Sequence, residues 1–405
     1  MEKTERTIVV GIYNRREQRR KAEETLAELE ELVRSAGGEV VGRVLHRRPR
    51  YDPAYLVGKG KIVEIAAMAE ELDADLVVFD ESLSPAQHRN IEKMVDTKVL
   101  DRTQLILDIF AQRAMTREGK LQVELAQLTY LLPRLTGKGR EMSRLGGGIG
   151  TRGPGEKKLE YDRRRINERI KRIKREISDV RKRREVQRKH RKKENIPTVA
   201  LVGYTSAGKT TLFNLLTGAD KKISRALFTT LDPVLRRVTL PSGFPVLLSD
   251  TVGFIRKLPV ELVTAFRATL EETIEADVLL HVVDVSSEHY REEIEAVEKT
   301  LQDLDAMDKP IIKVFNKIDL LPRKDYFLLK NRDNNSEVYI SARTGEGVED
   351  LLNKIEGVIM SGFEIKTIFI PFSKQSDLEE IKKRGIILSR EVLEEGIKIK
   401  VGKKK

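Results

Sequence analysis

The chain has no cysteine and no tryptophan among its 405 residues. The absence of thiols excludes disulfides, thiol nucleophiles and cysteine-ligated metals. Histidine is also scarce, and the spacing of a metal-ligand set is not seen among His46, His88, His190, His281 and His289. We therefore expect no transition metal held by protein side chains.

Long apolar runs are missing as well. No stretch of 18 uncharged apolar residues occurs, so the sequence predicts no membrane-spanning helix. Residues 1–6 lack the apolar core of a signal peptide. We expect a cytoplasmic protein.

Charge is abundant but unevenly distributed. Charged residues make up 35% of the chain and the formal net charge is +12. Residues 157–193 alone contain 19 lysines and arginines against six aspartates and glutamates, a net of +13. Such a segment is either a solvated helix face or the binding surface for a polyanion. Self-repulsion favours a polyanion, and RNA is favoured over membrane because the apolar stripe of the segment is thin.

The first hundred residues alternate between apolar runs and amphipathic stretches. The runs predict strands at 7–13, 39–45, 75–79 and 98–100, separated by helices at 16–35, 61–72 and 85–95. This alternation is typical of a small α/β domain with a mostly parallel sheet, which we place at residues 1–100. The run Gly58-Lys59-Gly60-Lys61 is either an anion site at a helix N-terminus or a turn and cap.

Residues 101–195 predict a helical hairpin. The first helix, 101–135, carries a leucine stripe, and the second carries apolar residues at alternating spacings of three and four. Between them, residues 137–155 are rich in glycine and contain Arg140, Arg144 and Arg152. This tip loop (136–157) is either a hinge or a segment slim enough to enter a space lined by RNA. The two stripes consist of Leu121, Leu125, Leu128 and Leu132, and of Leu159, Ile166, Ile170, Ile173, Ile177 and Val180.

The stretch GYTSAGKT at 203–210 follows the apolar run 198–202 and precedes a helical pattern. This is the context of a phosphate-binding P-loop, in which glycines let backbone N–H groups approach the phosphates. We expect Lys209 to reach the β and γ phosphates as a catalytic group. The Thr210 hydroxyl would bind Mg²⁺.

Two further segments complete a phosphate site. Asp250 ends an apolar strand and is placed to hold Mg²⁺ through water, while the Gly253 N–H would sense the γ-phosphate as a second catalytic group. Thr230, in the loop between the P-loop and this strand, is predicted as the third catalytic group and as a metal ligand when triphosphate is bound.

Base selection is predicted from two later segments. Asp319, in the run Asn316-Lys317-Ile318-Asp319, would accept hydrogen bonds from guanine N1–H and the 2-amino group, and Lys317 would lie against the base. The Ala342 N–H would face guanine O6. GTP or GDP with Mg²⁺ is therefore the predicted ligand. The full set of predicted nucleotide-binding residues is Gly203, Tyr204, Thr205, Ser206, Ala207, Gly208, Lys209, Thr210, Thr211, Phe228, Thr229, Thr230, Asp250, Thr251, Val252, Gly253, Asn316, Lys317, Asp319, Ser341, Ala342 and Arg343.

These motifs resemble the translation-factor-like GTPases and, in particular, the HflX family. The resemblance is carried by DRT at 101–103, LILDIFA at 105–111, QVELAQL at 122–128, GGGIGTRGPGE at 146–156 and DTVGFI at 250–255. It implies an α/β fold with a P-loop GTPase domain (196–361), an N-terminal α/β domain, the antiparallel hairpin and a small α+β C-terminal domain (362–405). It also implies a monomeric GTPase that binds the large ribosomal subunit, places the hairpin tip near the peptidyl transferase centre and splits stalled ribosomes. ATP use by the N-terminal domain is implied more weakly.

Two residues depart from what such an enzyme needs to hydrolyse GTP unaided. Phe254 stands where a glutamine orients the attacking water in Ras-type enzymes. Ser206 stands where related GTPases use an asparagine to hold a monovalent cation. We therefore expect slow intrinsic hydrolysis and activation by the ribosome rather than by K⁺. Two alternatives remain open, namely a checkpoint GTPase in large-subunit assembly and an RNA-binding module with a structural nucleotide.

Overall fold

The computed structural model describes residues 4–135, 154–193, 196–220, 227–257, 270–322, 336–374 and 386–404. The chain divides into two compact units. The N-terminal unit comprises residues 1–178 with 226–228 and 257–266, and the nucleotide unit comprises 179–225, 229–256 and 267–405. None of the helices in the described ranges is long and apolar enough to cross a membrane.

The N-terminal unit begins with a four-stranded sheet in the order β2-β1-β3-β4, in which every pair is parallel. The order of strands and helices matches the prediction, with ends shifted by up to three residues. The elements are β1 (Arg6–Tyr13), η1 (Arg16–Gln18), α1 (Arg19–Ala36), β2 (Glu39–Arg47), α2 (Lys59–Glu71), β3 (Leu76–Phe79), α3 (Pro85–Val95) and β4 (Lys98–Asp101).

The side chains of β1 alternate between the two faces of this sheet, and both faces are buried. Ile8, Val10 and Ile12 share one apolar cluster with α2 and α3. Gly11 lies on the opposite face of the strand, where an added Cβ would lie 3.3 Å from the Leu26 side chain of α1. Both faces are therefore covered by helices, as parallel sheets require.

The predicted single helix at 101–135 is wrong, because the structure has two helices there. Helix α4 (Arg102–Arg113) ends where Ala114 turns extended, and α5 (Arg117–Leu131) begins anew. The Thr116 hydroxyl accepts a hydrogen bond from the Gly119 N–H and so caps α5. A short 3₁₀ turn, η2 (Leu132–Leu135), follows.

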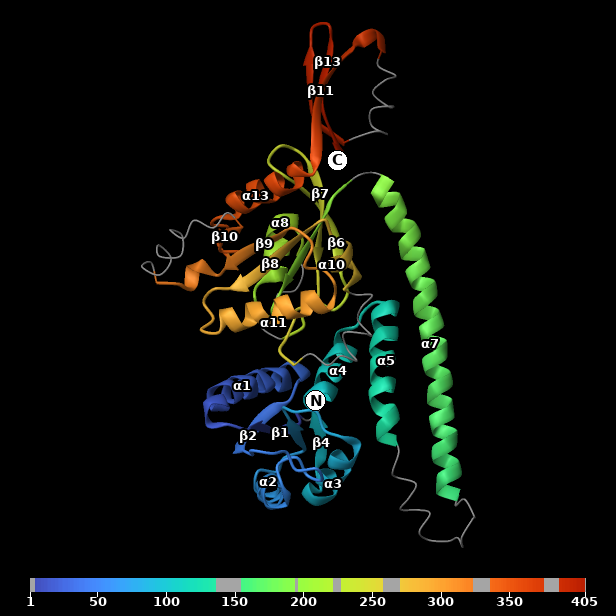
Figure 1. Cartoon of the computed structure of the whole chain (residues 1–405), viewed down its shortest axis with the longest axis vertical. Coiled ribbons are helices and arrows are strands. Elements are labelled where there is room, and N and C mark those ends of the chain that lie inside the picture. Colours follow the sequence, from blue (N-terminus) through green and yellow to red (C-terminus); the bar gives the residue numbers. More distant parts are fainter. Residues whose placement is uncertain are drawn as a thin grey trace. The chain divides into compact units, whose positions relative to one another are not determined.

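The hairpin partner of α5 is α7 (Pro154–Lys193), the long green helix of Figure 1. Leu121, Leu125 and Leu128 of α5 pack with Ile173 and Ile177 of α7. Arg117 pairs with Glu176 and, further along α5, Glu124 binds Arg169 through two contacts of 2.7 Å. Partner numbers fall on α7 as they rise on α5, so the helices are antiparallel, as predicted. The predicted tip loop lies outside the described residues except for its last four, 154–157, which belong to α7.

The nucleotide unit contains a six-stranded sheet in the order β10-β9-β8-β5-β7-β6, parallel except for the edge strand β6. Leu212 and Phe213 of α8 and Leu351 and Ile355 of α13 share one core with β5, and α11 packs on β5 and β8. The elements are β5 (Thr198–Gly203), α8 (Lys209–Thr217), β6 (Val234–Thr239), β7 (Pro245–Asp250), α10 (Glu271–Glu275), β8 (Val278–Asp284), α11 (Tyr290–Asp303), β9 (Ile311–Asn316), η4 (Ile318–Leu320), β10 (Glu337–Tyr339) and α13 (Val348–Ser361).

The chain ends in an antiparallel sheet of order β11-β13-β12. Its strands are β11 (Phe363–Pro371), β12 (Ile386–Leu393) and β13 (Gly396–Lys404), with η5 (Phe372–Lys374) after β11. Ile370, Ile397 and Ile399 form its buried centre. These strands supply the β part of the small α+β domain expected at residues 362–405, and residues 375–385 lie outside the described ranges.

The packing between α5 and α7 predicts that truncating a buried side chain there lowers the free energy of unfolding. Ile173 is fully buried there, so Ile173→Ala should lower the free energy of unfolding by about 2–5 kcal/mol, the usual range for such a core truncation. Urea unfolding of the full chain, followed by circular dichroism, measures it. Val186→Ala on the same helix is the control, because Val186 is 69% exposed; equal effects of the two changes would contradict the packing described.

Candidate functional site

The loop between β5 and α8 is shaped by two glycines. Gly203 has φ 151°, and a Cβ there would lie 2.2 Å from the Val282 carbonyl oxygen. Gly208 has φ 96°, and a Cβ there would lie 2.2 Å from Asn316 Nδ2. A side chain at either position would collide with its neighbour, so the tight curl of the predicted phosphate loop requires glycine.

Lys209 opens α8 and is buried under this loop. Its ammonium donates to the Gly203 carbonyl at 3.0 Å and to the Tyr204 carbonyl at 2.6 Å. Burial lowers the pKa of Lys209 to about 8, although the Asp250 carboxylate acts in the opposite direction. A phosphate is a stronger acceptor for an ammonium than a carbonyl, and it would stabilise the charged form.

Three oxygen-bearing side chains converge beside Lys209. The Thr230 hydroxyl donates to Asp250 Oδ2 at 2.9 Å and lies 3.2 Å from the Thr210 hydroxyl, which is 3.3 Å from the same carboxylate oxygen. Hydroxyl and carboxylate oxygens are the donors that Mg²⁺ prefers. The residues predicted as metal ligands therefore lie together and fit that ion.

The segment after Asp250 lies directly against the phosphate loop. The Phe254 N–H donates to the Gly203 carbonyl at 3.0 Å, and the Thr205 N–H donates to the Phe254 carbonyl at 2.8 Å. A Cβ on Gly253 would lie 2.9 Å from Thr205 Cγ2 and 3.2 Å from Lys209 Nζ. The Phe254 side chain is 1% exposed, which agrees with the expectation that it does not orient water.

The predicted base-binding segments are tied to the same loop. Asn316 donates to the Ala207 carbonyl at 2.8 Å and accepts from the Ala342 N–H at 2.9 Å. The Ser341 hydroxyl donates to Asp319 Oδ1 at 2.7 Å. Asn316 thus links its own segment to the phosphate loop, 109 residues earlier in the chain, and to the segment of Ala342, 26 residues later.

Four details differ from, or add to, the predictions. The Ala342 N–H does not face open space, because it donates to Asn316, so a guanine O6 would have to share this donor. The Thr251 hydroxyl donates to the Leu201 carbonyl and is buried, so it stabilises the sheet rather than pointing toward a ligand.

Lys317 forms an ion pair with Asp284 at the end of β8. Asp284 was not predicted from the sequence, although an acidic residue at the end of a buried strand was an available signal.

The other predicted ligands surround this centre. Ala207 and Val252 are buried, whereas Ser206 is exposed with φ 61° and Arg343 is largely exposed, 4.0 Å from Asp319. Phe228 is buried, and Thr211 and Thr229 are half-buried. At the alternative anion site, Lys61 pairs with Glu64 and Arg48 lies beside Gly58.

The lowered pKa of Lys209 predicts a pH dependence of nucleotide binding. Phosphate selects the ammonium form, and in the free protein this form is lost as pH rises through about 8. GDP affinity should therefore fall about tenfold between pH 7 and 9. Equilibrium binding measures it. In Lys209→Arg the guanidinium stays charged between pH 7 and 9. The GDP affinity of this variant, whatever its absolute value, should therefore not change with pH. A pH dependence equal to that of the unaltered protein would contradict the role of Lys209.

Asp319 offers a second test. Asp319→Asn replaces an acceptor of two base N–H groups with an amide, so affinity for guanine nucleotides should fall about tenfold or more, whereas that for xanthosine nucleotides should rise. Competition binding with GDP and xanthosine diphosphate measures the preference. Asp308→Asn, outside the predicted set, serves as control. Unaltered guanine selectivity in Asp319→Asn would refute the assignment.

Comparison with known proteins agrees with this geometry. Residues 23–111 match the family described as GTP-binding GTPase N-terminal, residues 113–191 its middle region, and residues 198–317 the family described as 50S ribosome-binding GTPase.

Individual relatives extend this match over nearly the whole chain. GTPase HflX of Caldanaerobacter subterraneus subsp. tengcongensis is 49% identical over 396 residues, which cover 98% of this chain and 90% of that protein. GTPase HflX of Escherichia coli is 47% identical over 352 residues, 87% of this chain and 82% of that protein. The chain therefore belongs to the HflX family of GTPases and is a GTP-hydrolysing enzyme.

Proposed function

We propose that this GTPase binds the large ribosomal subunit through its α5–α7 hairpin and splits or rescues stalled ribosomes. The proposal rests on one observation above all. An apolar seam and the ion pairs of Arg169 with Glu124 and of Arg117 with Glu176 hold the two helices together. The other basic residues of α7 whose burial is described all lie on its exposed surface.

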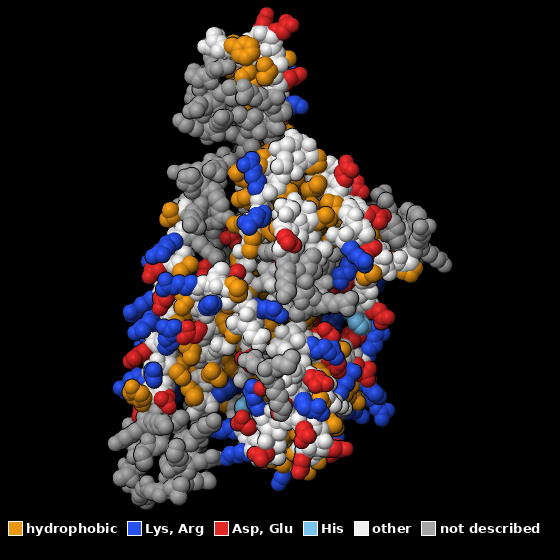
Figure 2. Space-filling model, turned by 180° about the vertical axis from the view of Figure 1, so that it is seen from behind, with side chains coloured by type: hydrophobic (Ala, Val, Ile, Leu, Met, Phe, Trp, Pro, Cys, Tyr) orange, Lys and Arg blue, Asp and Glu red, His pale blue; other side chains and the backbone are white. Residues whose placement is uncertain are grey.

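The exposed face of α7 supports an RNA partner. The lysines and arginines at 163–165, 171, 172, 174, 175 and 181–183 are exposed. Blue side chains accordingly line the outer flank of the hairpin in Figure 2. A row of cations along one helix matches the repeated phosphates of an RNA backbone, and each neutralised phosphate releases a counterion. The match of residues 198–317 to a 50S ribosome-binding GTPase family points to ribosomal RNA.

The nucleotide unit would supply the group of residues that responds to the γ-phosphate of GTP. Thr210, Thr230 and Asp250 would hold Mg²⁺, with Asp250 acting through water, and Lys209 would bind the β and γ phosphates. Mg²⁺ would neutralise charge on the phosphates, while the Gly253 N–H would register the γ-phosphate.

We assign the domains as 1–100, 101–195, 196–361 and 362–405. Since the family is one of GTPases, we do not retain the alternative of a non-catalytic RNA-binding module.

The glycine-rich tip offers the sharpest test of ribosome splitting. Deleting residues 146–155 should leave basal GTP hydrolysis within about twofold of the intact chain, because the nucleotide site is elsewhere, and should abolish subunit separation. Phosphate release and sucrose-gradient profiles of 70S ribosomes measure the two activities. Subunit separation by the deletion variant would contradict the proposal.

Two further variants distinguish loss of the tip's function from general damage to the protein. Replacing Arg140, Arg144 and Arg152 together by alanine keeps the loop length and should also impair splitting. Lys299→Ala, an exposed change on α11, should leave splitting intact. Binding to precursor large subunits but not to mature ribosomes would instead favour the assembly checkpoint.

A further inference from the structure

A groove lies between α5 and α7, close to the points where both helices meet the tip loop. Its volume is about 780 Å³, and residues of α5, η2 and α7 line it. All of these residues belong to the N-terminal unit. The groove is separate from the nucleotide site, and its size is within the range of small-ligand pockets, roughly 300–1,000 Å³.

The floor of the groove is apolar. It includes Leu128 of α5, Leu135 of η2 and Ile166 of α7, each of which is only partly buried. Leu128 also packs against the buried seam of the hairpin. At this end of the hairpin, the seam therefore leaves apolar surface exposed. The flat face of a ligand would bury that surface favourably.

Tyr161 stands on α7 beside this floor, with 66% of its surface exposed. Arg164 and Arg165 follow three and four residues later, so they lie on the same face of the helix as the ring. Arg172 lines the groove further along α7, and all three arginines are exposed. An exposed ring flanked by guanidinium groups suits single-stranded nucleic acid, because the ring stacks on a base while the cations bind the neighbouring phosphates.

The charges around the groove favour an extended anionic ligand. Four arginines and two carboxylates line it, and one of these arginines, Arg169, is bound by Glu124 at 2.7 Å. The exposed lysines and arginines at 171–183 continue the positive surface along α7. A nucleic-acid strand that enters the groove can follow this row of cations, whereas a small anion cannot.

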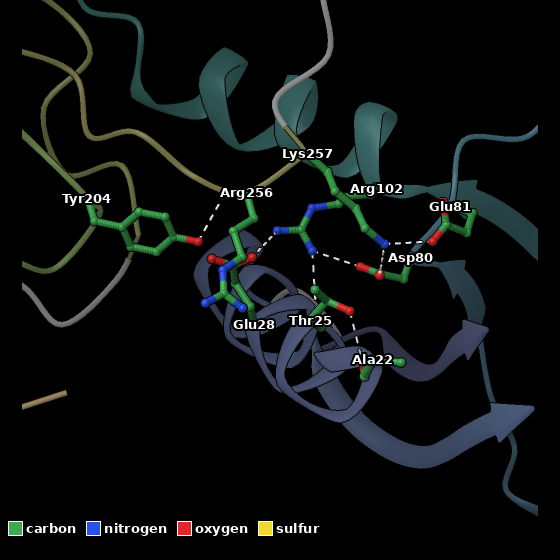
Figure 3. Close-up of polar contacts among 9 residues, drawn as sticks. All are labelled: Ala22, Thr25, Glu28, Asp80, Glu81, Arg102, Tyr204, Arg256 and Lys257. Carbon is green, nitrogen blue, oxygen red and sulfur yellow. Dashed lines mark hydrogen bonds and ion pairs between the residues drawn. The ribbon is translucent and has the colours of Figure 1, made fainter. Parts of the chain in front are cut away.

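The α5 wall of the groove is held in place within the N-terminal unit. The Tyr130 hydroxyl, at the end of α5, donates to the Asp101 carboxylate at the end of β4. The neighbouring Arg102 is almost fully buried and pairs with Asp80 and Glu28 (Figure 3). A wall that is already fixed loses little conformational entropy when a ligand binds, and this favours affinity.

We propose that the groove binds one unpaired nucleotide of RNA, with its base stacked on Tyr161 over the apolar floor. Arg164, Arg165 and Arg172 bind the adjacent phosphates. This subsite rests on the proposed function, in which the hairpin binds RNA, and it adds a requirement for an unstacked base. The protein therefore binds single-stranded RNA more tightly than a duplex of the same length, because the bases of a duplex are stacked on one another.

Tyr161→Leu tests the stacking, because it removes the ring, keeps an apolar side chain and alters an exposed position. For the full chain, affinity for a fluorescent single-stranded RNA of about 12 nucleotides should fall about tenfold, the usual loss when one stacked base loses its aromatic partner. Affinity for the duplex should stay within about twofold. Tyr161→Phe should bind both RNAs like the unaltered chain. Tyr51→Leu, at another exposed tyrosine of the same unit, is the matched control and should also change neither affinity.

Arg165→Gln tests the phosphate contact independently of the stacking. The slope of log affinity against log salt concentration for the single strand should become shallower by about 0.7, the value for one lost phosphate contact. Tyr161→Leu should leave this slope unchanged, since it removes no charge. Lys299→Gln on α11 is the control and should change neither affinity nor slope.

The outcomes distinguish this subsite from the hairpin's general role. Full single-strand affinity in Tyr161→Leu, or an equal loss for single strand and duplex, would overturn the stacking subsite; a shallower slope in Arg165→Gln would then still support the RNA-binding hairpin. An unchanged slope in Arg165→Gln, or no binding of either RNA by the unaltered chain, would count against the hairpin surface itself. Poly-glutamate that displaces the single strand as effectively as unlabelled RNA does would identify an acidic polypeptide as the ligand and overturn the proposal.

Discussion

The approach of Thr210, Thr230 and Asp250 to within 3.3 Å of one another is the constraint on which the nucleotide site depends. Each residue comes from a different segment: the start of α8, the loop before β6 and the end of β7. Oxygens brought this close suit a small divalent cation. Any displacement of the loop that carries Thr230, or of the segment that follows Asp250, would separate the set.

Those two segments are also the ones that contribute residues to the N-terminal unit. Leu227 and Phe228 are held by α1 and α4, and Lys257 is held by Asp80 and Glu81 at the end of β3.

Much of this arrangement could be predicted from local sequence. The phosphate loop, Asp250 and the base-binding run are each contained in a few consecutive residues, and apolar periodicity placed most strands and helices to within three residues. The break between α4 and α5 was missed because the leucine stripe begins only at Leu121, after the break, and a single capping residue, Thr116, marks the start of the second helix. The pairing of Lys257 with Asp80 joins positions 177 residues apart, and no local pattern encodes such a contact. For the same reason, the link through Asn316 from Ala207 to Ala342 emerged only in the folded chain.

The most direct test of the account is GTP turnover measured together with ribosome splitting, in one titration of the full chain with purified large subunits. Turnover by the protein alone should be slow, because buried Phe254 cannot orient water, and it should rise to saturation as large subunits are added. Over the same range of protein concentration, 70S ribosomes should separate only when GTP is present. Turnover that does not respond to large subunits, together with intact 70S particles at saturating protein and GTP, would contradict it.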